Sequence, residues 1–292
     1  MDDTMRKIIA TVVFIAIELL LLPISLIGYV WLAVKLILIS RRTGMSATAY
    51  SPLFTRWMLH ETGVRKDLAC KRVLMSLPGI SALNLHMLTG STFLAARLSG
   101  LQPGFMNYPV TLPSTIMTMV NHRTAFFDKA LLDHLDKVKQ VVILGAGWDT
   151  RAYNMLKEDR VRVFEVDTAK TQRVKQTALQ QAGIDTAHVT FVTADFNREP
   201  WLDSLKRYNF DPKQPAFFLW EGVIYYLEAE AVKATINAVS SQITSGSAIA
   251  FDYFCRELVA GVGRLTFRYG AKWSQAVGEP LQFGIPTEST GP

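Results

Sequence analysis

The sequence predicts an α/β protein, in which an open parallel β-sheet follows a long apolar helix. Two observations carry this prediction. Short apolar runs alternate with helical stretches between residues 137 and 253, the order that produces a parallel sheet covered by helices. A much longer apolar run lies between residues 8 and 40. The chain has 292 residues, enough for one such domain with additional elements.

The N-terminal apolar run is longer than a membrane-spanning helix requires. As one helix, residues 8–40 would be about 50 Å long, whereas the hydrocarbon core of a bilayer is about 30 Å thick. Its charged residues are Glu18 and Lys35, and Pro23 is expected to kink it. We therefore expect residues 1–42 to form a membrane anchor, either a tilted or kinked transmembrane helix or a monotopic helix.

Basic residues are denser after this run than before it. Arg41 and Arg42 close the run, and Arg56, Arg65 and Lys66 follow. By the positive-inside tendency, the rest of the chain is expected to face the cytoplasm. The net charge is +6, but basic residues never occur more than two in a row. This balance favours anionic lipid over nucleic acid as a partner, with an ordinary solvated surface as the equal alternative.

Residues 43–120 are expected to form a helical cap or membrane-proximal segment. Proline and glycine punctuate this stretch at residues 52, 78–79 and 103–104, which predicts short helices joined by loops. The cysteines, Cys70 and Cys255, lie far apart and outside any ligand cluster, so neither a disulfide framework nor a metal site is expected.

The first predicted strand runs into a glycine turn. Residues 141–147 read VVILGAG, and a continuous apolar run is typical of a strand buried on both faces of a parallel sheet. Gly145 and Gly147 permit a tight turn and a close approach of the backbone to a ligand. A dinucleotide-binding fingerprint would next require Gly or Ala, where this sequence has Thr150. The pattern thus favours a nucleoside ligand over a nicotinamide or flavin cofactor.

The second predicted strand, residues 161–167, ends in an acid. Asp167 lies 20 positions after Gly147, a spacing that suits hydrogen bonds to both ribose hydroxyls. Glu165 would share its face of the strand and could also bind the ligand. The alternative for Asp167 is an N-cap for the helix that begins near Thr168.

Further predicted strands cover residues 189–195, 216–221 and 247–253. Asp195, followed by Phe196, ends the first of these, and we expect this pair to hold an adenine ring. Glu221 ends the next strand, and Asp252 lies near the end of the last. Because ligands bind at the carboxyl edge of an open α/β sheet, we expect these acids to line one cleft.

The motifs together resemble those of the S-adenosylmethionine-dependent methyltransferases in the leucine carboxyl methyltransferase family, nearest to its bacterial branch of uncharacterised O-methyltransferases. They are RTAFFD at 123–128, LGAGWDTRAY at 144–153, FEVD at 164–167, ADF at 194–196, WEGVIYYL at 220–227, GEP at 278–280 and FGIP at 283–286. The resemblance covers about residues 121–288. It implies a Rossmann-like class I methyltransferase sheet within a domain of residues 121–292.

The resemblance also implies a role for each matching residue. Arg123 would pair with the methionine carboxylate of S-adenosylmethionine, unless it forms an ordinary surface salt bridge. Glu221 would lie near the amine or the sulfonium of the cofactor. Gly145 and Gly147 would approach the cofactor through their backbone, Asp167 would bind ribose, and Asp195 with Phe196 would hold adenine.

Methyl transfer asks little else of the protein, because the sulfonium makes its methyl group strongly electrophilic. The acceptor oxygen must be held in line and sheltered from water. A carboxylate acceptor needs no general base, whereas a hydroxyl acceptor needs one. The weak candidates for such a catalytic residue are His122, Tyr225 and Tyr226; ordinary packing explains the two tyrosines equally well.

Two features set this chain apart from the family it resembles. The apolar N-terminus suggests work at a membrane on a lipophilic acceptor. The C-terminus stops shortly after the FGIP motif, so the antiparallel hairpin that closes the sheet is expected to be missing, exposing an edge. Three functions therefore stay open: O-methylation of a small or lipophilic acceptor at the membrane, carboxyl methylation of a protein C-terminus, and a truncated, non-catalytic pseudo-enzyme that binds the cofactor.

Overall fold

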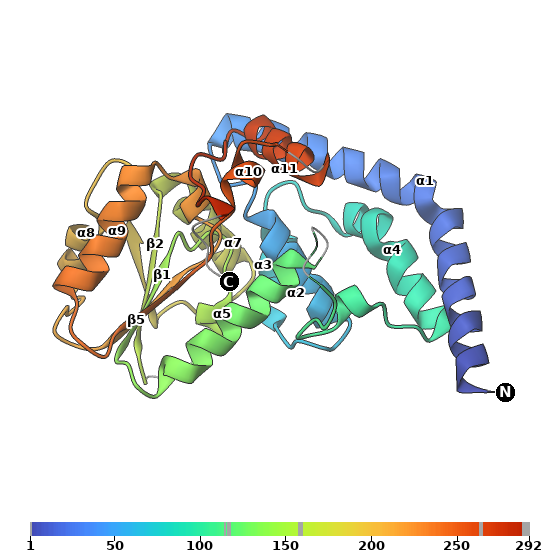
Figure 1. The fold of residues 1–292 in the computed structure, drawn as a ribbon, viewed down its shortest axis with the longest axis horizontal. Coiled ribbons are helices and arrows are strands. Elements are labelled where there is room, and N and C mark those ends of the chain that lie inside the picture. Colours follow the sequence, from blue (N-terminus) through green and yellow to red (C-terminus); the bar gives the residue numbers. More distant parts are fainter. Residues whose placement is uncertain (1, 114, 116–117, 157–159, 263–264, 288–292) are drawn as a thin grey trace.

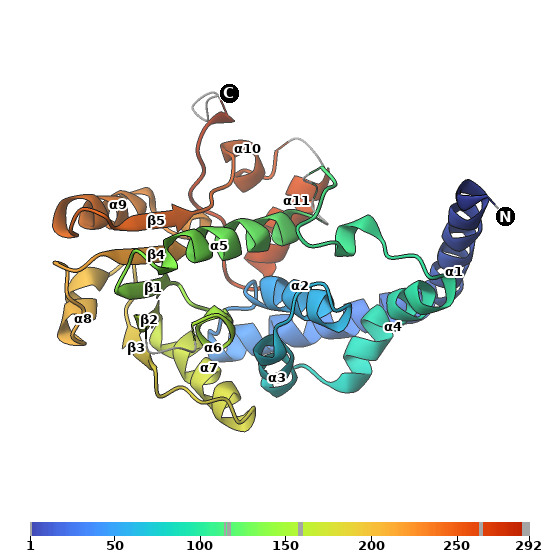
Figure 2. The same ribbon diagram turned by 90° about the horizontal axis from the view of Figure 1, so that it is seen from below.

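The computed structural model describes residues 2–113, 115, 118–156, 160–262 and 265–287. It contains a parallel sheet in the order β3-β2-β1-β4-β5, at the end of the molecule away from the N-terminus (Figures 1 and 2). The strands are β1 (Gln140–Leu144), β2 (Arg162–Asp167), β3 (Val189–Thr193), β4 (Ala216–Trp220) and β5 (Ala248–Phe251). The parallel α/β sheet predicted from the apolar runs is confirmed.

Side chains that alternate along the central strands point into two separate hydrophobic clusters. Val141 and Ile143 of β1 pack with α5 (Met119–Leu135), α6 (Arg151–Asn154) and α7 (Ala169–Gln181). Val142 and Leu144 pack on the opposite face with α8 (Trp201–Arg207) and α9 (Ala229–Gln242). Both faces of the sheet are thus covered, which explains why the strands read as unbroken apolar runs.

The segment between the apolar run and the sheet is helical. It contains α2 (Tyr50–Glu61), α3 (Leu68–Ser76), α4 (Ala82–Ser99) and the short η1 (Gly104–Met106). Leu53 of α2 and Val73 of α3 are fully buried in the same cluster as β1, so these two helices extend the core of the sheet domain. By contrast, α4 lies beside α1 and away from the sheet (Figures 1 and 2).

The N-terminal apolar run forms one helix, α1 (Asp3–Thr43), which contains Pro23. Figure 1 shows α1 bending along its length, as expected where a proline removes an intrahelical hydrogen bond. The helix ends at Gly44, whose positive φ of 66° lets its amide donate to the Ser40 carbonyl at 2.7 Å. By length and composition alone, α1 is able to cross a membrane.

The C-terminal segment returns toward the outer edge of the sheet. It holds α10 (Arg256–Val259) and α11 (Leu265–Ala276), after the short η2 (Ile224–Tyr226) that follows β4. The amide of Ile285 donates to the carbonyl of Phe254 at 3.0 Å. The amide of Arg256 donates to the carbonyl of Ile285, also at 3.0 Å. Among the described residues, β5 pairs with β4 alone. Residues 288–292, which we expected to form no strand, lie outside the described residues.

Candidate functional site

A cleft of about 510 Å³ opens at the carboxyl ends of β1 to β4. Most of the residues predicted to bind a ligand line it: Arg123, Gly145, Gly147, Asp167, Asp195, Phe196 and Glu221. For Asp167, Asp195 and Glu221, the expectation that successive strands bring their terminal acids to one place agrees with where the structure puts the side chains. Asp252, which was also expected there, is not among the residues that line the cleft. The volume falls within the range of about 300–1,000 Å³ that is usual for small-molecule sites.

The floor of the cleft is the turn after β1, which is joined to the end of β2. Gly145 has a φ of 67°, and a Cβ atom there would lie 2.3 Å from Cγ2 of Val223. The amide of Gly147 donates to Oδ2 of Asp167, and the amide of Thr168 donates to Oδ1, both at 2.6 Å. The N-cap of α7 is Thr168, so Asp167 is not the helix cap that was the alternative. Its carboxylate is instead fixed at the cleft by two backbone amides.

Asp195 and Phe196 form the side of the cleft at the end of β3. Oδ1 of Asp195 accepts the amide of Asn197 at 3.1 Å, which orients the carboxylate within the turn. The Phe196 ring packs against Trp201 and Trp220, with ring centroids 6.2 and 6.4 Å apart. A carboxylate that can accept hydrogen bonds therefore adjoins an aromatic face, a combination that suits a purine ring.

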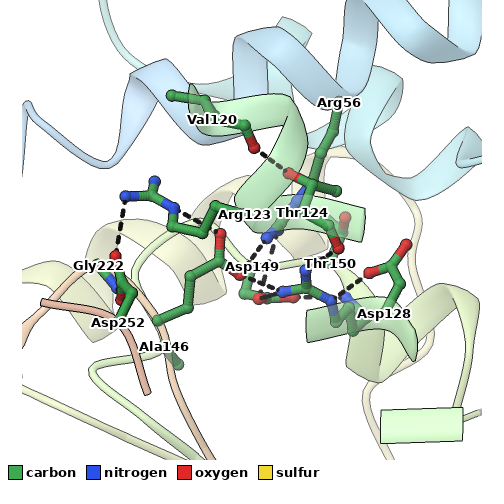
Figure 3. Close-up of polar contacts among 12 residues, drawn as sticks. Arg56, Val120, Arg123, Thr124, Asp128, Ala146, Asp149, Thr150, Gly222 and Asp252 are labelled. Carbon is green, nitrogen blue, oxygen red and sulfur yellow. Dashed lines mark hydrogen bonds and ion pairs between the residues drawn. The ribbon is translucent and has the colours of Figure 1, made fainter. Parts of the chain in front are cut away.

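Arg123 enters the cleft from α5 and is held by groups from β4 and the chain after β5. Its Nε donates to Oε1 of Glu221 at 3.1 Å, and its Nη1 donates to the hydroxyl of Tyr225 at 2.8 Å. Figure 3 shows the Arg123 guanidinium directed toward Asp252, which in turn accepts the amide of Gly222 at 2.6 Å. Arg123 is 9% exposed, so the simple surface salt bridge considered for it is excluded.

Behind Arg123 lies a buried ionic network that the sequence did not reveal. Its members are Arg56, Arg65, Arg123 and Arg151 together with Asp67, Asp128, Asp149, Glu221 and Asp252. Arg151 is fully buried and contacts Oδ1 of Asp128 at 2.6 Å and Oε2 of Glu221 at 2.5 Å. The same Glu221 oxygen accepts from Arg56 at 2.7 Å. Figure 3 shows Arg56 and Asp149 converging in this network.

Glu221 is consequently surrounded by three guanidinium groups. Burial alone would raise the pKa of its carboxyl, but the guanidiniums of Arg151, Arg56 and Arg123 lower it below its usual range. Of this ionic network, the sequence motifs contain the WDTR stretch after the glycine turn, which carries Asp149 and Arg151. Nothing in the sequence pattern indicated that Arg56, in the segment expected to be a cap, would line the same cleft.

Two predicted site residues lie outside the cleft lining. Glu165 is buried beneath the glycine turn, where its Oε2 lies 2.7 Å from Nζ of Lys175, which also donates to the Ala146 carbonyl at 3.3 Å. Period-two alternation placed Glu165 on the face of Asp167, but only the end of the strand reaches the cleft. Nε2 of His122 contacts the Leu112 carbonyl at 2.8 Å, so His122 is not positioned to act in the cleft.

Tyr225 and Tyr226 do line the cleft. Burial raises the pKa of Tyr225 well above its ordinary value and that of Tyr226 to about 12. Both hydroxyls are therefore protonated at neutral pH. They can donate or accept hydrogen bonds, but they are poorly suited to remove a proton from an acceptor.

The roof of the cleft is formed where the end of α1 and the residues after it contact the segment that follows α11. Oγ of Ser40, in the last turn of α1, donates to the Val277 carbonyl at 2.7 Å. The Glu279 carboxylate accepts the amides of Ala47 and Thr48 at 3.0 and 2.9 Å. The end of α1 and the segment after α11 thus close over the carboxyl edge of the sheet.

The parallel sheet carries acids along its carboxyl edge, which is the edge where open α/β sheets bind ligands. Residues 103–240, just under half of the chain, match the model of the leucine carboxyl methyltransferase family. The resemblance noted in the sequence motifs is thereby confirmed over this part of the chain.

Curated relatives are similar over the same part of the chain. A protein of Streptomyces avermitilis is 33% identical over 150 residues, which cover 51% of this chain and 53% of that protein. A Mycolicibacterium smegmatis protein is 34% identical over 162 residues, which cover 54% of this chain and 53% of that protein. Both are named "putative S-adenosyl-L-methionine-dependent methyltransferase". The chain spans about half the length of the curated relatives it matches.

Solved structures show a more distant likeness. A DUF574 family protein from Streptomyces avermitilis is 18% identical, with a TM-score of 0.45, over 60% of this chain and 68% of that chain. The structure of a "putative methyltransferase" from Thermobifida fusca is 17% identical, with a TM-score of 0.45, over 73% of this chain and 75% of that chain.

Proposed function

We propose that the chain is an S-adenosylmethionine-dependent methyltransferase that transfers a methyl group to an oxygen of a lipophilic acceptor at a membrane. The observation that carries the proposal is the position of Asp167, held by the Gly147 and Thr168 amides at the carboxyl edge of the sheet. A carboxylate in this position suits the two hydroxyls of a ribose. The names of the curated relatives support the same cofactor.

The residues that line the cleft fit each part of this cofactor. Asp167 would bind the ribose, and Asp195 with Phe196 would hold the adenine. Arg123 would pair with the methionine carboxylate, and we assign to Glu221 the task of positioning Arg123, because both Glu221 oxygens are occupied by guanidiniums. When bound, the cofactor supplies an electrophilic methyl group on a sulfonium with a neutral leaving thioether.

The character of the cleft favours an acceptor that is already ionised. No cleft-lining residue that the structure describes is a histidine, and the two tyrosines are held protonated. A hydroxyl acceptor would need a base, which the protonated tyrosines do not supply, whereas a carboxylate acceptor needs none. The work left to the protein is to orient the acceptor oxygen and to exclude water. We therefore propose a carboxylic acid as the acceptor.

The proposal that the acceptor is lipophilic depends on attachment of the chain to a membrane. Helix α1 is long and apolar enough to enter a bilayer, and its last turn contributes Ser40 and Arg41 to the cleft. An acceptor carried in the membrane would thus arrive next to the cofactor. We propose that the chain operates on the cytoplasmic side, because the basic residues that follow α1 closely suit the anionic lipids of the cytoplasmic leaflet.

The proposal is tested by incubating the full chain, in detergent micelles, with methyl-labelled S-adenosylmethionine and a long-chain fatty acid. We expect labelled methyl ester, little product from the alcohol of the same chain length, and almost none from the Asp167→Asn variant. Transfer only to a peptide C-terminus would favour protein carboxyl methylation instead. Cofactor binding without transfer to any of these acceptors would favour the non-catalytic alternative.

A further inference from the structure

Helix α1 presents an exposed face that is apolar along nearly its whole length. Val12, Leu19, Leu20, Ile27 and Val30 are between 57% and 77% exposed. The face continues from Ile8 to Leu38, which corresponds to about 45 Å of helix. A bilayer has a hydrocarbon core of about 30 Å, so the face is half as long again as a perpendicular crossing requires.

The opposite face of α1 is covered by α4, which runs antiparallel to it (Figures 1 and 2). A Cβ atom on Gly28 would lie 2.8 Å from the backbone nitrogen of Leu88, so the two helices are in close contact there. Nearer the N-terminus, Oγ of Ser91 donates to Glu18 and pairs with Ser25, both at 3.0 Å. The acid in the middle of α1 thus points toward α4 and not toward the exposed face.

This pairing makes a crossing by α1 costly. A crossing segment about 20 residues long that begins near Ile8 would include Glu18 and Ser25, and would take Ser91 to the same depth. The following turns of α4 carry an exposed Arg97, and the chain leaves the helix at Gly100. Both a charged side chain and an irregular backbone would then enter the hydrocarbon, where each is strongly unfavourable.

The charges at the ends of α1 point to a single membrane surface. Arg6 and Lys7 precede the apolar face, where Lys7 pairs with Asp3 at 2.8 Å, and Arg41 and Arg42 follow it. A crossing helix places its two ends in different compartments, whereas basic residues at both ends suit anionic headgroups on one side. An interface between two copies of the chain has no comparable need for a cationic pair at each end.

We infer that α1 lies in the plane of the membrane, with its exposed face in one leaflet and α4 on the opposite side, and that it does not cross. The inference rests on the membrane attachment in the proposed function but not on the methyl transfer. It also places the cleft, which Ser40 and Arg41 line, at the surface of the leaflet that holds the helix. The acceptor would therefore be an amphiphile of that leaflet, with its carboxylate at headgroup level.

The topology is tested by labelling single thiols with a membrane-impermeant maleimide. The full chain, carrying Cys255→Ser, is bound to sealed vesicles of equimolar phosphatidylcholine and phosphatidylglycerol; Cys70 is fully buried and stays in place. Thr4→Cys reports the start of α1, and Ala234→Cys, at an exposed position on α9, is the matched reference. We expect both thiols to react equally before the vesicles are opened. Reaction of the Thr4→Cys thiol only after detergent is added would overturn the inference.

A second measurement separates the two faces by vesicle flotation. Val12→Glu combined with Val30→Glu is expected to reduce flotation at least tenfold, whereas Leu98→Glu, at a 63% exposed position of α4, should leave it unchanged. Equal losses in both variants would contradict the in-plane arrangement. Failure of the unaltered chain to float, with self-association through α1, would instead show that a second copy covers this face. Binding of S-adenosylmethionine, measured on the same samples, reports on the methyltransferase proposal independently.

Discussion

The Asp167 carboxylate accepts a hydrogen bond of 2.6 Å from the amide of Gly147, and this contact ties the end of β2 to the turn after β1. A second amide, from Thr168, holds the other carboxylate oxygen. Both oxygens keep a lone pair for a ligand in the cleft. The contact thus orients the group that we assign to the ribose before any ligand binds.

Replacing Asp167 should weaken cofactor binding more than it weakens the fold. In Asp167→Asn one charged acceptor is lost while the shape is kept, and hydrogen bonds to charged groups contribute about 1.5–3 kcal/mol. We expect the dissociation constant for S-adenosylmethionine, measured by equilibrium dialysis, to rise about tenfold to a hundredfold. Asp203→Asn, on the exposed side of α8, is the control and should bind normally. Unchanged affinity in Asp167→Asn would remove the ribose assignment.

The glycine turn offers a test of local geometry. Ala at position 145 would adopt a φ of 67° with its Cβ atom 2.3 Å from Val223, so the turn must shift. We expect Gly145→Ala to abolish measurable binding in a thermal-shift titration with S-adenosylmethionine. Gly100→Ala has a similar φ of 71° but open space around the added atom. It should lose about 1 kcal/mol of stability and retain its ligand response.

The buried network predicts a large stability effect at Arg151. Its guanidinium contacts Asp128, Asp149 and Glu221, and removal of one partner from a buried ion pair typically costs about 3–5 kcal/mol. We expect Arg151→Met to lower the free energy of unfolding by this amount in guanidinium titrations. Lys129→Met breaks an exposed pair on α5 and should leave the midpoint close to that of the unaltered chain. Similar midpoints for both variants would show that the network contributes little.

The same network should make the fold sensitive to acid. Burial by itself raises the pKa of Asp128, but the charges of Arg151 and Arg65 lower it to about 2. Because the folded pKa lies below the unfolded one of about 3.9, Asp128 stabilises the fold above pH 4. This contribution, on the order of 2 kcal/mol, is lost as the pH falls toward 2. Asp128→Asn should flatten the pH dependence of the unfolding free energy in that window; an unchanged slope would contradict it.

The sheet was predictable because its sequence pattern is local. Each strand is an apolar run, the last four end near an acid, and the parallel order brings these strand ends to one edge. The predicted strands extended past the observed ends, as in residues 189–195 against β3, because the acids belong to the turns that follow. His122 and Glu165 were misplaced for a related reason: neighbourhood in sequence does not fix which way a side chain faces.

The ionic network and the covering of α1 were not predictable, since both depend on contacts distant in sequence. Arg56 meets Glu221 across 165 positions, and Glu18 meets Ser91 across 73. An apolar run shows that a helix avoids water, but not which part of it another helix covers. For that reason the sequence left a crossing and an in-plane helix open.

Calorimetric titration of the full chain in detergent tests whether the cleft at the carboxyl edge of the sheet binds S-adenosylmethionine. We expect a saturable heat of one cofactor per chain, with S-adenosylhomocysteine competing for the same site and Asp167→Asn weakening the binding. No heat from the unaltered chain, in a sample shown to be folded by its cooperative thermal transition, would contradict this expectation.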